Sequence, residues 1–308
     1  MDIIQKNLLQ TIAGIDVIPE GAYNIRSNGV LSSRNTTENV DIVTKKDKSG
    51  IDIFIKDGTK GEKVHIPVII SETGLNDLVY NDFHIGKDCD VTIVAGCGIH
   101  NCGSEKSSHD GIHSFFVGKN SKLKYIEKHY GEGGKEEAGG ENVMNPTTII
   151  NLSEGSMMEM ETTQIKGIDS TNRITNARLE KGATLVIHEK LMTHGSQYAR
   201  TEFNVELEGE DSGTNVVSRS VAKDTSNQIF ISKIYGNNRC SGHTECDAII
   251  MDNATVSAIP EIVASSTEAS LIHEAAIGKI AGEQLTKLMT LGLTEDEAEE
   301  QIVNGFLK

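Results

Sequence analysis

The stretch Leu179-Glu-Lys-Gly-Ala-Thr-Leu185 decides the fold, because its pattern recurs along the chain. The pattern is an apolar residue, any residue, a charged residue, then Gly, Asn or Asp, a small residue, any residue and an apolar residue. Gly, Asn and Asp tolerate the left-handed backbone of a tight turn, and the small residue lets neighbouring coils of chain approach. Further copies are Ile85-Gly-Lys-Asp-Cys-Asp-Val91, Val117-Gly-Lys-Asn-Ser-Lys-Leu123 and Leu152-Ser-Glu-Gly-Ser-Met-Met158, with looser copies from Leu207 and Ile250. The starts at 85, 117, 152, 179, 207 and 250 are 27 to 43 residues apart.

Short runs rich in β-branched residues lie between these turns, for example Thr147-Thr-Ile-Ile150, Thr184-Leu-Val-Ile-His188 and Gln228-Ile-Phe-Ile-Ser232. Such runs are typical of strands. Turns and strands that alternate in this way, without helices between them, predict the stacked coils of a β-solenoid. A doubly wound α/β fold is the rival. It requires amphipathic helices between the strands, and residues 25–270 contain no such pattern.

The two ends of the chain have a different pattern. At the N-terminus, four apolar residues with helical spacing precede the stop signal Gly14: Ile3, Ile4, Leu8 and Ile12. Near the other end, apolar residues with helical spacing run from Ile277 to Met289 and stop at Gly292. A capping box, Thr294-Glu-Asp-Glu297, then begins a second helix. We therefore predict a short N-terminal helical segment over 1–24, an all-β solenoid core over 25–276 and a C-terminal helical hairpin over 277–308.

The composition limits the classes of function. Aromatic residues make up 4% of the 308 residues, there are 30 Gly and 4 Pro, and the formal net charge is −16. Few aromatic side chains and an acidic balance disfavour nucleic-acid binding, which relies on stacking and on attraction to phosphate. No apolar run is long enough to span a bilayer, and the first residues lack the features of a secretory signal. Five cysteines without such a signal are interpreted as reduced thiols of a cytoplasmic protein.

One group of cysteine and histidine residues lies within seventeen positions of the chain: Cys97, His100, Cys102, His109 and His113. Thiolate and imidazole are ligands of zinc and iron, so the group is a candidate metal site. Its spacing matches no standard zinc finger, and a polar turn with buried thiols remains the alternative.

A second group is Cys240 and Cys246, with His243 between them. The even offset between the two cysteines places both thiols on one face of a strand, unless a turn at Ser241-Gly242 breaks the alternation. The alternative is that Cys246 begins an apolar strand and is a core residue. A third feature is His273-Glu274, which interrupts the apolar run from Leu271 to Ile277. Burying these two side chains is costly unless they are paired or bind a ligand, whereas an exposed solenoid edge would satisfy both without any function.

Several motifs follow one another in a specific order after these cysteines. They are Glu245-Cys-Asp-Ala-Ile-Ile250, Pro260, His273-Glu-Ala-Ala-Ile-Gly-Lys-Ile-Ala-Gly-Glu-Gln-Leu285, Gly292-Leu-Thr-Glu-Asp-Glu-Ala298 and Ile302-Val-Asn-Gly-Phe306. This ordered set resembles the SufB/SufD family, whose members are core components of the SUF machinery that assembles iron–sulfur clusters. The resemblance is strongest over residues 215–308 and extends more weakly over the repeats, back to residue 25. The chain resembles a short, single-protein form of the family.

The resemblance implies a right-handed parallel β-helix with helical ends, which serves as a scaffold and not as an enzyme. It also implies that two chains pair through their β-helices and that the C-terminal helices dock an ABC-type ATPase, SufC. ATP would then be hydrolysed only on the partner subunit, which fits the absence of a phosphate-binding loop motif from this sequence. The residues expected to contact the ATPase are Gly282, Leu285, Leu288, Met289 and Gly292.

By the same resemblance, Cys246, Glu274 and His273 fall at the site of the nascent, transient iron–sulfur cluster. One chain carries both the cysteine and the His-Glu pair, so a homodimer would supply both halves of the site; a heterodimer with a related chain is the alternative. Cys240, His243, Cys97, His100 and Cys102 are second-tier metal candidates. A sulfur donor and recipient apoproteins would be the further partners of such a scaffold.

Two other classes of function stay open at this point. A cytoplasmic metal-binding or delivery protein would use the cysteine and histidine groups alone. A β-helix enzyme that acts on polysaccharides would be expected to carry an export signal and aromatic platforms for sugar rings, and this sequence shows neither.

Overall fold

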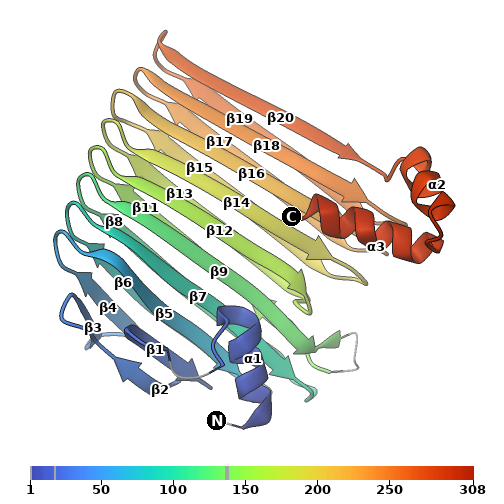
Figure 1. Ribbon diagram of the computed structural model, residues 1–308, viewed down its shortest axis with the longest axis horizontal. Helices are drawn as coiled ribbons and strands as arrows, with labels where there is room; N and C mark the ends of the chain where they lie inside the picture. Colours follow the sequence, from blue (N-terminus) through green and yellow to red (C-terminus); the bar gives the residue numbers. More distant parts are fainter. Residues whose placement is uncertain (1, 17–18, 136–138) are drawn as a thin grey trace.

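The chain alternates between two ten-stranded sheets in the computed structural model, which describes residues 2–16, 19–135 and 139–308 (Figure 1). Through most of the molecule each coil adds one strand to each sheet, and neighbouring coils pair in parallel. Only the pairs β1–β2 and β3–β4, at the N-terminal end, are antiparallel among the described strands. The predicted all-β solenoid is therefore confirmed.

Sheet A contains, in spatial order, β2 (Val30–Asn35), β1 (Ala22–Ser27), β5 (Lys60–Ile70), β7 (Asp90–Asn101), β9 (Lys122–Gly133), β12 (Met157–Lys166), β14 (Thr184–Thr193), β16 (Ser212–Ala222), β18 (Cys240–Ile250) and β20 (Ala269–Gly278). Sheet B contains β19 (Thr255–Ala264), β17 (Asn227–Gly236), β15 (Tyr198–Leu207), β13 (Ser170–Leu179), β10 (Asn142–Met144), β8 (Ser107–Val117), β6 (Asn76–Ile85), β4 (Gly50–Ile55) and β3 (Val40–Thr44). A further strand, β11 (Thr147–Leu152), also pairs with both β8 and β13.

The repeated turns have the conformation that the sequence pattern predicts. In the four close copies the turn residue is left-handed, with φ between 54° and 67°: Asp88, Asn120, Gly155 and Gly182. The small residue that follows is almost fully buried in every copy: Cys89, Ser121, Ser156 and Ala183. Backbone amides of these turns bond to the next coil, as from Asp88 N to Lys119 O at 2.9 Å, so the turns stack in register.

Side chains alternate between the inside and the outside of the solenoid. Inward positions of both sheets form one core of mainly aliphatic residues, and its few aromatic rings stack between coils, as Phe83 does on Phe115 at 4.4 Å. The small number of aromatic residues therefore fits a thin interior between two sheets.

Three helices cover parts of this structure: α1 (Ile3–Ala13), α2 (Gly282–Thr290) and α3 (Glu295–Phe306). Helix α1 packs on the outer face of sheet A, where Gly96 leaves room for it: a Cβ at this position would lie 3.0 Å from the carbonyl oxygen of Ile12. None of the helices in the described ranges has the length and apolarity needed to cross a membrane.

The C-terminal helical hairpin is confirmed, with one correction. The expected helix from Ile277 begins only at Gly282, because Ile277 is still part of β20 and pairs in register with Ala248. The capping box is present, since Thr294 and Glu297 bond to each other's backbone amides. Helix α3 packs through Val303 and Leu307 on the outer face of sheet A.

The C-terminal end of the solenoid is open. Strands β19 and β20 each pair with one neighbour only and form the last coil (Figure 1). Ile262 and Ile277 lie in register with buried residues and so point inward, yet each is 39% exposed because no described coil covers them. The boundaries of the three predicted parts remain a prediction.

Candidate functional site

Cys246 lies on β18 with its side chain inside the solenoid. It follows the inward alternation of Cys240, Thr244 and Ala248, and only 1% of its surface is exposed. Burial raises the pKa of its thiol to about 12, with smaller contributions from the negative charges of Glu189 and Asp247. The resting thiol is therefore protonated and shielded, and it needs a rearrangement before it can act as a thiolate ligand.

His273 lies on β20, the last strand, and also points inward. It pairs in register with Thr244, which is fully buried, and side chains paired across parallel strands point to the same side. Its Nδ1 atom is buried without a hydrogen-bond partner. Burial lowers the pKa of His273, and the nearby His243 lowers it further. Cys246 and His273 are thus diagonal neighbours inside the open end of the solenoid.

Glu274 points the other way. It lies beside Glu245 on the outer face of sheet A and its side chain is 66% exposed. There it faces His243, with 3.7 Å between Oε2 of Glu274 and Nε2 of His243. The other ring nitrogen of His243 bonds to Asn215 Oδ1 at 2.9 Å. The structure therefore brings Cys246 and His273 together inside the sheet, and Glu274 and His243 together outside it.

A row of polar side chains inside sheet A leads to Cys246. In register along successive coils the row is Glu127, Thr162, Glu189, Ser218 and Cys246. Ser218 Oγ donates to Glu189 Oε2 at 2.7 Å, and Thr201 Oγ1 donates to Glu189 Oε1 at 3.0 Å.

Arg173, from the opposite sheet, joins two members of this row. It forms an ion pair with Glu127 and lies 3.8 Å from Glu189, and all three side chains are buried. Sequence analysis missed the row because its members come from different coils. Aligning the turn repeats on one another would have placed them in one line.

The remaining candidates are spread apart. Cys240 and Cys246 do share the inner face, as the even spacing predicts, because β18 continues unbroken through Ser241-Gly242. Six residues of strand nevertheless separate them by about 20 Å, too far to bind one small cluster together.

The first cysteine group is also divided. Cys97 is buried inside the solenoid, and burial raises the pKa of its thiol well above the usual range. His100 faces outward, and Cys102 is exposed just beyond the end of β7. Cys97 therefore does not share a site with His100 and Cys102. The other members of the group, His109 and His113, are buried on β8, where they bond to Asp77 and Tyr125.

Another group of metal-ligand types lies elsewhere. Asp52, Asp82 and His84 bring ligand atoms within 4.8 Å of one another on the outer face of sheet B. The ammonium group of Lys45 lies between the two carboxylates and bonds to both, at 2.7 Å from Asp82. The protein's own ammonium group thus already occupies the position between the two carboxylates.

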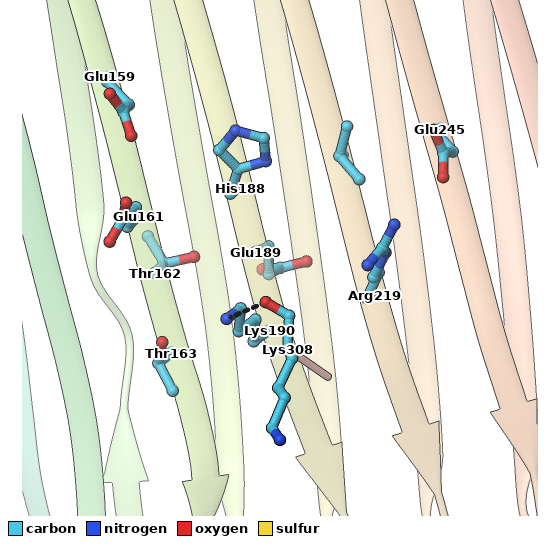
Figure 2. A pocket seen from close by; sticks show the side chains of 11 residues that line it. Glu159, Glu161, Thr162, Thr163, His188, Glu189, Lys190, Arg219, Glu245 and Lys308 are labelled. Carbon is cyan, nitrogen blue, oxygen red and sulfur yellow. Dashed lines mark hydrogen bonds between the residues drawn. The ribbon is translucent and has the colours of Figure 1, made fainter. Parts of the chain in front are cut away.

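A groove of about 440 Å³ opens on the outer face of sheet A, beside the C-terminal end of α3 (Figure 2). Its walls carry both signs of charge, from Glu161, Lys190, Arg219 and Glu245 among others. Lys190 donates a 2.8 Å hydrogen bond to the carbonyl oxygen of Lys308, which fixes the end of the chain there. The groove was not foreseen from the sequence, because its residues come from four strands of separate coils.

The residues expected to contact a partner lie on or beside α2. This helix has no buried residue, although Leu285 and Leu288 are partly covered. Met289 is 44% exposed and the neighbouring Leu291 is 76% exposed. The helix thus presents apolar surface that the chain itself does not cover.

A known protein family matches most of this chain. The family profile described as SUF system FeS cluster assembly, SufBD core domain, matches residues 78–306. The chain belongs to the SufBD family. It is 30% identical to the iron–sulfur cluster assembly SufBD family protein of Methanocaldococcus jannaschii over 258 residues, which is 83% of this chain and 79% of the relative. It is 29% identical to a SufBD family protein of Pyrococcus horikoshii over 285 residues, which is 89% of this chain and 82% of the relative.

Membership of the SufBD family connects the chain with iron–sulfur cluster assembly. The profile covers β18, β20 and both C-terminal helices, so Cys246, His273, Glu274 and α2 all lie within the SufBD core.

Proposed function

We propose that this SufBD protein is a non-enzymatic scaffold on which an iron–sulfur cluster is built transiently, at the open end of the solenoid. Cys246 is the principal ligand, and His273 and Glu274 complete the protein's share of the site. The observation that carries this proposal is the inward pair of Cys246 and His273, whose Nδ1 atom is buried without a partner, in the coils next to an uncovered end. Thiolate and imidazole are both ligands of iron, and a mixed set of ligands suits a cluster that must later be released.

A second copy of the chain docks on the last coil. Strands β19 and β20 offer unpaired backbone groups, and Ile262 and Ile277 expose apolar surface from the unfinished core. Exposed edge strands of this kind are templates for pairing with another chain. A homodimer across this end places two copies of Cys246 and His273 near one interface.

An ABC-type ATPase of the SufC kind docks on α2, through Leu285, Leu288 and Met289, with Gly282 and Gly292 at the ends of the helix. Hydrolysis of ATP takes place on that partner. Closure of two ATPase subunits pulls the C-terminal helices, which follow β20 directly, and so uncovers Cys246 and brings Glu274 into the site. Uncovering Cys246 removes the burial that raises the pKa of its thiol and keeps it protonated at rest.

We place the scaffold in the cytoplasm, where its five cysteines stay free, together with a sulfur donor and the recipient apoproteins.

The test is cluster build-up on the purified complex with the ATPase, under anaerobic supply of ferrous iron and sulfide. We expect Cys246→Ser to lose the visible absorption of the cluster and its acid-labile sulfide. Cys89→Ser is the matched control, because Cys89 occupies a buried turn position where other coils carry Ser121 and Ser156. Unchanged build-up in Cys246→Ser would refute the assignment. A preparation that holds zinc without labile sulfide would instead support a metal-delivery protein.

A further inference from the structure

Cys102, His100 and Glu132 form a hydrogen-bonded chain on the surface of the protein. The Sγ atom of Cys102 lies 3.2 Å from Nε2 of His100. On the other side of the ring, Nδ1 of His100 lies 3.1 Å from Oε2 of Glu132. The second carboxylate oxygen, Oε1, accepts a 2.9 Å hydrogen bond from the hydroxyl of Tyr130. A thiol, an imidazole and a carboxylate are thus connected in the order that activates a nucleophile.

The fold fixes this geometry. His100 and Glu132 are direct partners in the register of β7 and β9, and both point to the outer face of sheet A. The carboxylate beside Nδ1 favours the ring form with its proton on Nδ1, so the lone pair of Nε2 faces the thiol. Cys102 follows the last residue of β7, and of the five cysteines, all within the described part of the chain, it is the one that is exposed.

Glycines pack against the backbone on either side of Cys102. The glycine-rich segment after β9 bonds directly to the backbone around Cys102, from Gly134 N to Asn101 O and from Gly140 N to Gly103 O. A Cβ on Gly140 would lie 2.0 Å from the carbonyl oxygen of Glu105, so this close approach requires glycine. The ammonium of Lys166 lies 5.9 Å from the centre of the Tyr130 ring.

We infer that Cys102, His100 and Glu132 form a thiol-exchange site, at which the thiolate of Cys102 attacks a sulfur–sulfur bond carried by another molecule. His100 Nε2 takes the thiol proton, and Glu132 stabilises the resulting imidazolium. The thiolate forms a bond to one sulfur of the substrate while the S–S bond breaks, and the departing thiolate takes the proton back from His100. A disulfide leaves a mixed disulfide on Cys102, and a persulfide attacked at its outer sulfur leaves a persulfide. No net oxidation occurs in either case.

This site is separate from the proposed cluster site, and neither proposal depends on the other. The substrate class is a small or protein-borne molecule with an S–S bond. A persulfide would leave a transferable sulfur atom on Cys102, whereas a disulfide would make Cys102 a site of reversible modification.

The experiment measures the reaction of the reduced, metal-free full chain with dipyridyl disulfide between pH 5 and pH 9, with the labelled cysteine identified by peptide mass spectrometry. We expect Cys102 to react first and Cys102→Ser to abolish this phase. His100→Asn should slow the reaction about tenfold or more at neutral pH and move the rate profile to higher pH, because the thiol loses its proton acceptor. Glu132→Gln should do so to a smaller extent. His84→Asn, an exposed histidine on sheet B, is the control and should match the wild type.

Equal rates and pH profiles for the wild type and His100→Asn would overturn the proposal, as would labelling of a buried cysteine ahead of Cys102. A second arm uses glutathione persulfide. Gain of a single sulfur atom by Cys102 would show that it takes the outer sulfur of a persulfide. Glutathione disulfide is tested in parallel, and gain of glutathione from it would show that Cys102 exchanges with disulfides; no reaction with either would overturn the proposal.

Discussion

Cys246 and Glu274 lie on neighbouring strands of sheet A but on opposite faces of it. Cys246 pairs in register with Ala275, and Glu274 with Glu245, so the sheet itself separates the thiol from the carboxylate. A cluster bound by both residues of one chain therefore requires that β20 move, or that the two groups come from different copies. Under the proposed function, the free chain is therefore a resting state, and loosening of the last coil is the step that would make the site competent.

The first prediction concerns access to Cys246. With a pKa of about 12, roughly one Cys246 thiol in ten thousand is ionised at pH 8, and the side chain is buried. We expect iodoacetamide to modify Cys246 in the free chain far more slowly than the exposed Cys102, as measured by mass spectrometry over time. Under the proposed function, addition of a SufC-like ATPase with ATP should accelerate modification of Cys246 selectively. If Cys246 reacted as fast as Cys102 in the free chain, the resting state described here would be wrong.

The second prediction concerns Arg173, which is buried between Glu127 and Glu189. Arg173→Met leaves both carboxylates inside the solenoid without a counter-charge, so we expect the free energy of unfolding to fall by about 3–5 kcal/mol. Arg178→Met is the matched control, because Arg178 lies on the same strand but is 64% exposed, with Glu208 at 3.9 Å. Its loss should cost less than about 1 kcal/mol. Denaturant unfolding of both variants tests the difference, and similar losses in the two would contradict the role of Arg173.

The repeated turns show how far the sequence determines the fold. Asp88, Asn120 and Gly155 adopt the left-handed turn conformation that their residue types tolerate, and the small residue after each of them is buried. The local pattern of the turns therefore indicated the spacing of the coils and the positions of the strands. The start of α2 did not follow in this way. Ile277 fits a helical pattern, but pairing with Ala248 across the sheet keeps it in a strand, and single-chain spacing does not reveal that partner.

The site was predictable in part. The alternation along β18 placed Cys240 and Cys246 on one face correctly, whereas the opposite orientations of His273 and Glu274 depended on the register with β18. The buried charges of Glu127 and Arg173 come from sheets A and B, in residues 46 positions apart, so no local motif marks them.

The third prediction concerns acid stability. Burial lowers the pKa of His129 to about 3 and that of His113 to about 4, from 6.5. The unfolded chain therefore takes up protons at these residues below pH 6.5, and the folded chain does not. Stability is unaffected by them above this pH and falls as the pH drops from 6.5 toward 4, by up to about 1.4 kcal/mol per pH unit for each histidine.

His129→Gln tests this slope, because the amide can still accept the hydrogen bond that Nδ1 of His129 receives from Arg173. Urea unfolding at pH 7, 6 and 5 should show a smaller loss of stability for the variant than for the wild type. Glu127, whose pKa is held low by Arg173 and the two histidines despite its burial, adds a further loss only below about pH 4.5. Parallel pH slopes for the variant and the wild type would show that His129 is not a source of the acid sensitivity.

The last prediction concerns the open end of the solenoid. Ile277 points inward from β20 and is 39% exposed, because no further coil covers it. If a second copy covers this end, Ile277→Glu places a charge in the interface and should convert dimers to monomers, as measured by light scattering during size-exclusion chromatography. Ile149→Glu is the matched control, since Ile149 is 37% exposed on β11, on the outer face of sheet B and away from the last coil. Circular dichroism melting curves of both variants check that the solenoid remains folded. A folded Ile277→Glu protein that stays dimeric would place the dimer interface elsewhere.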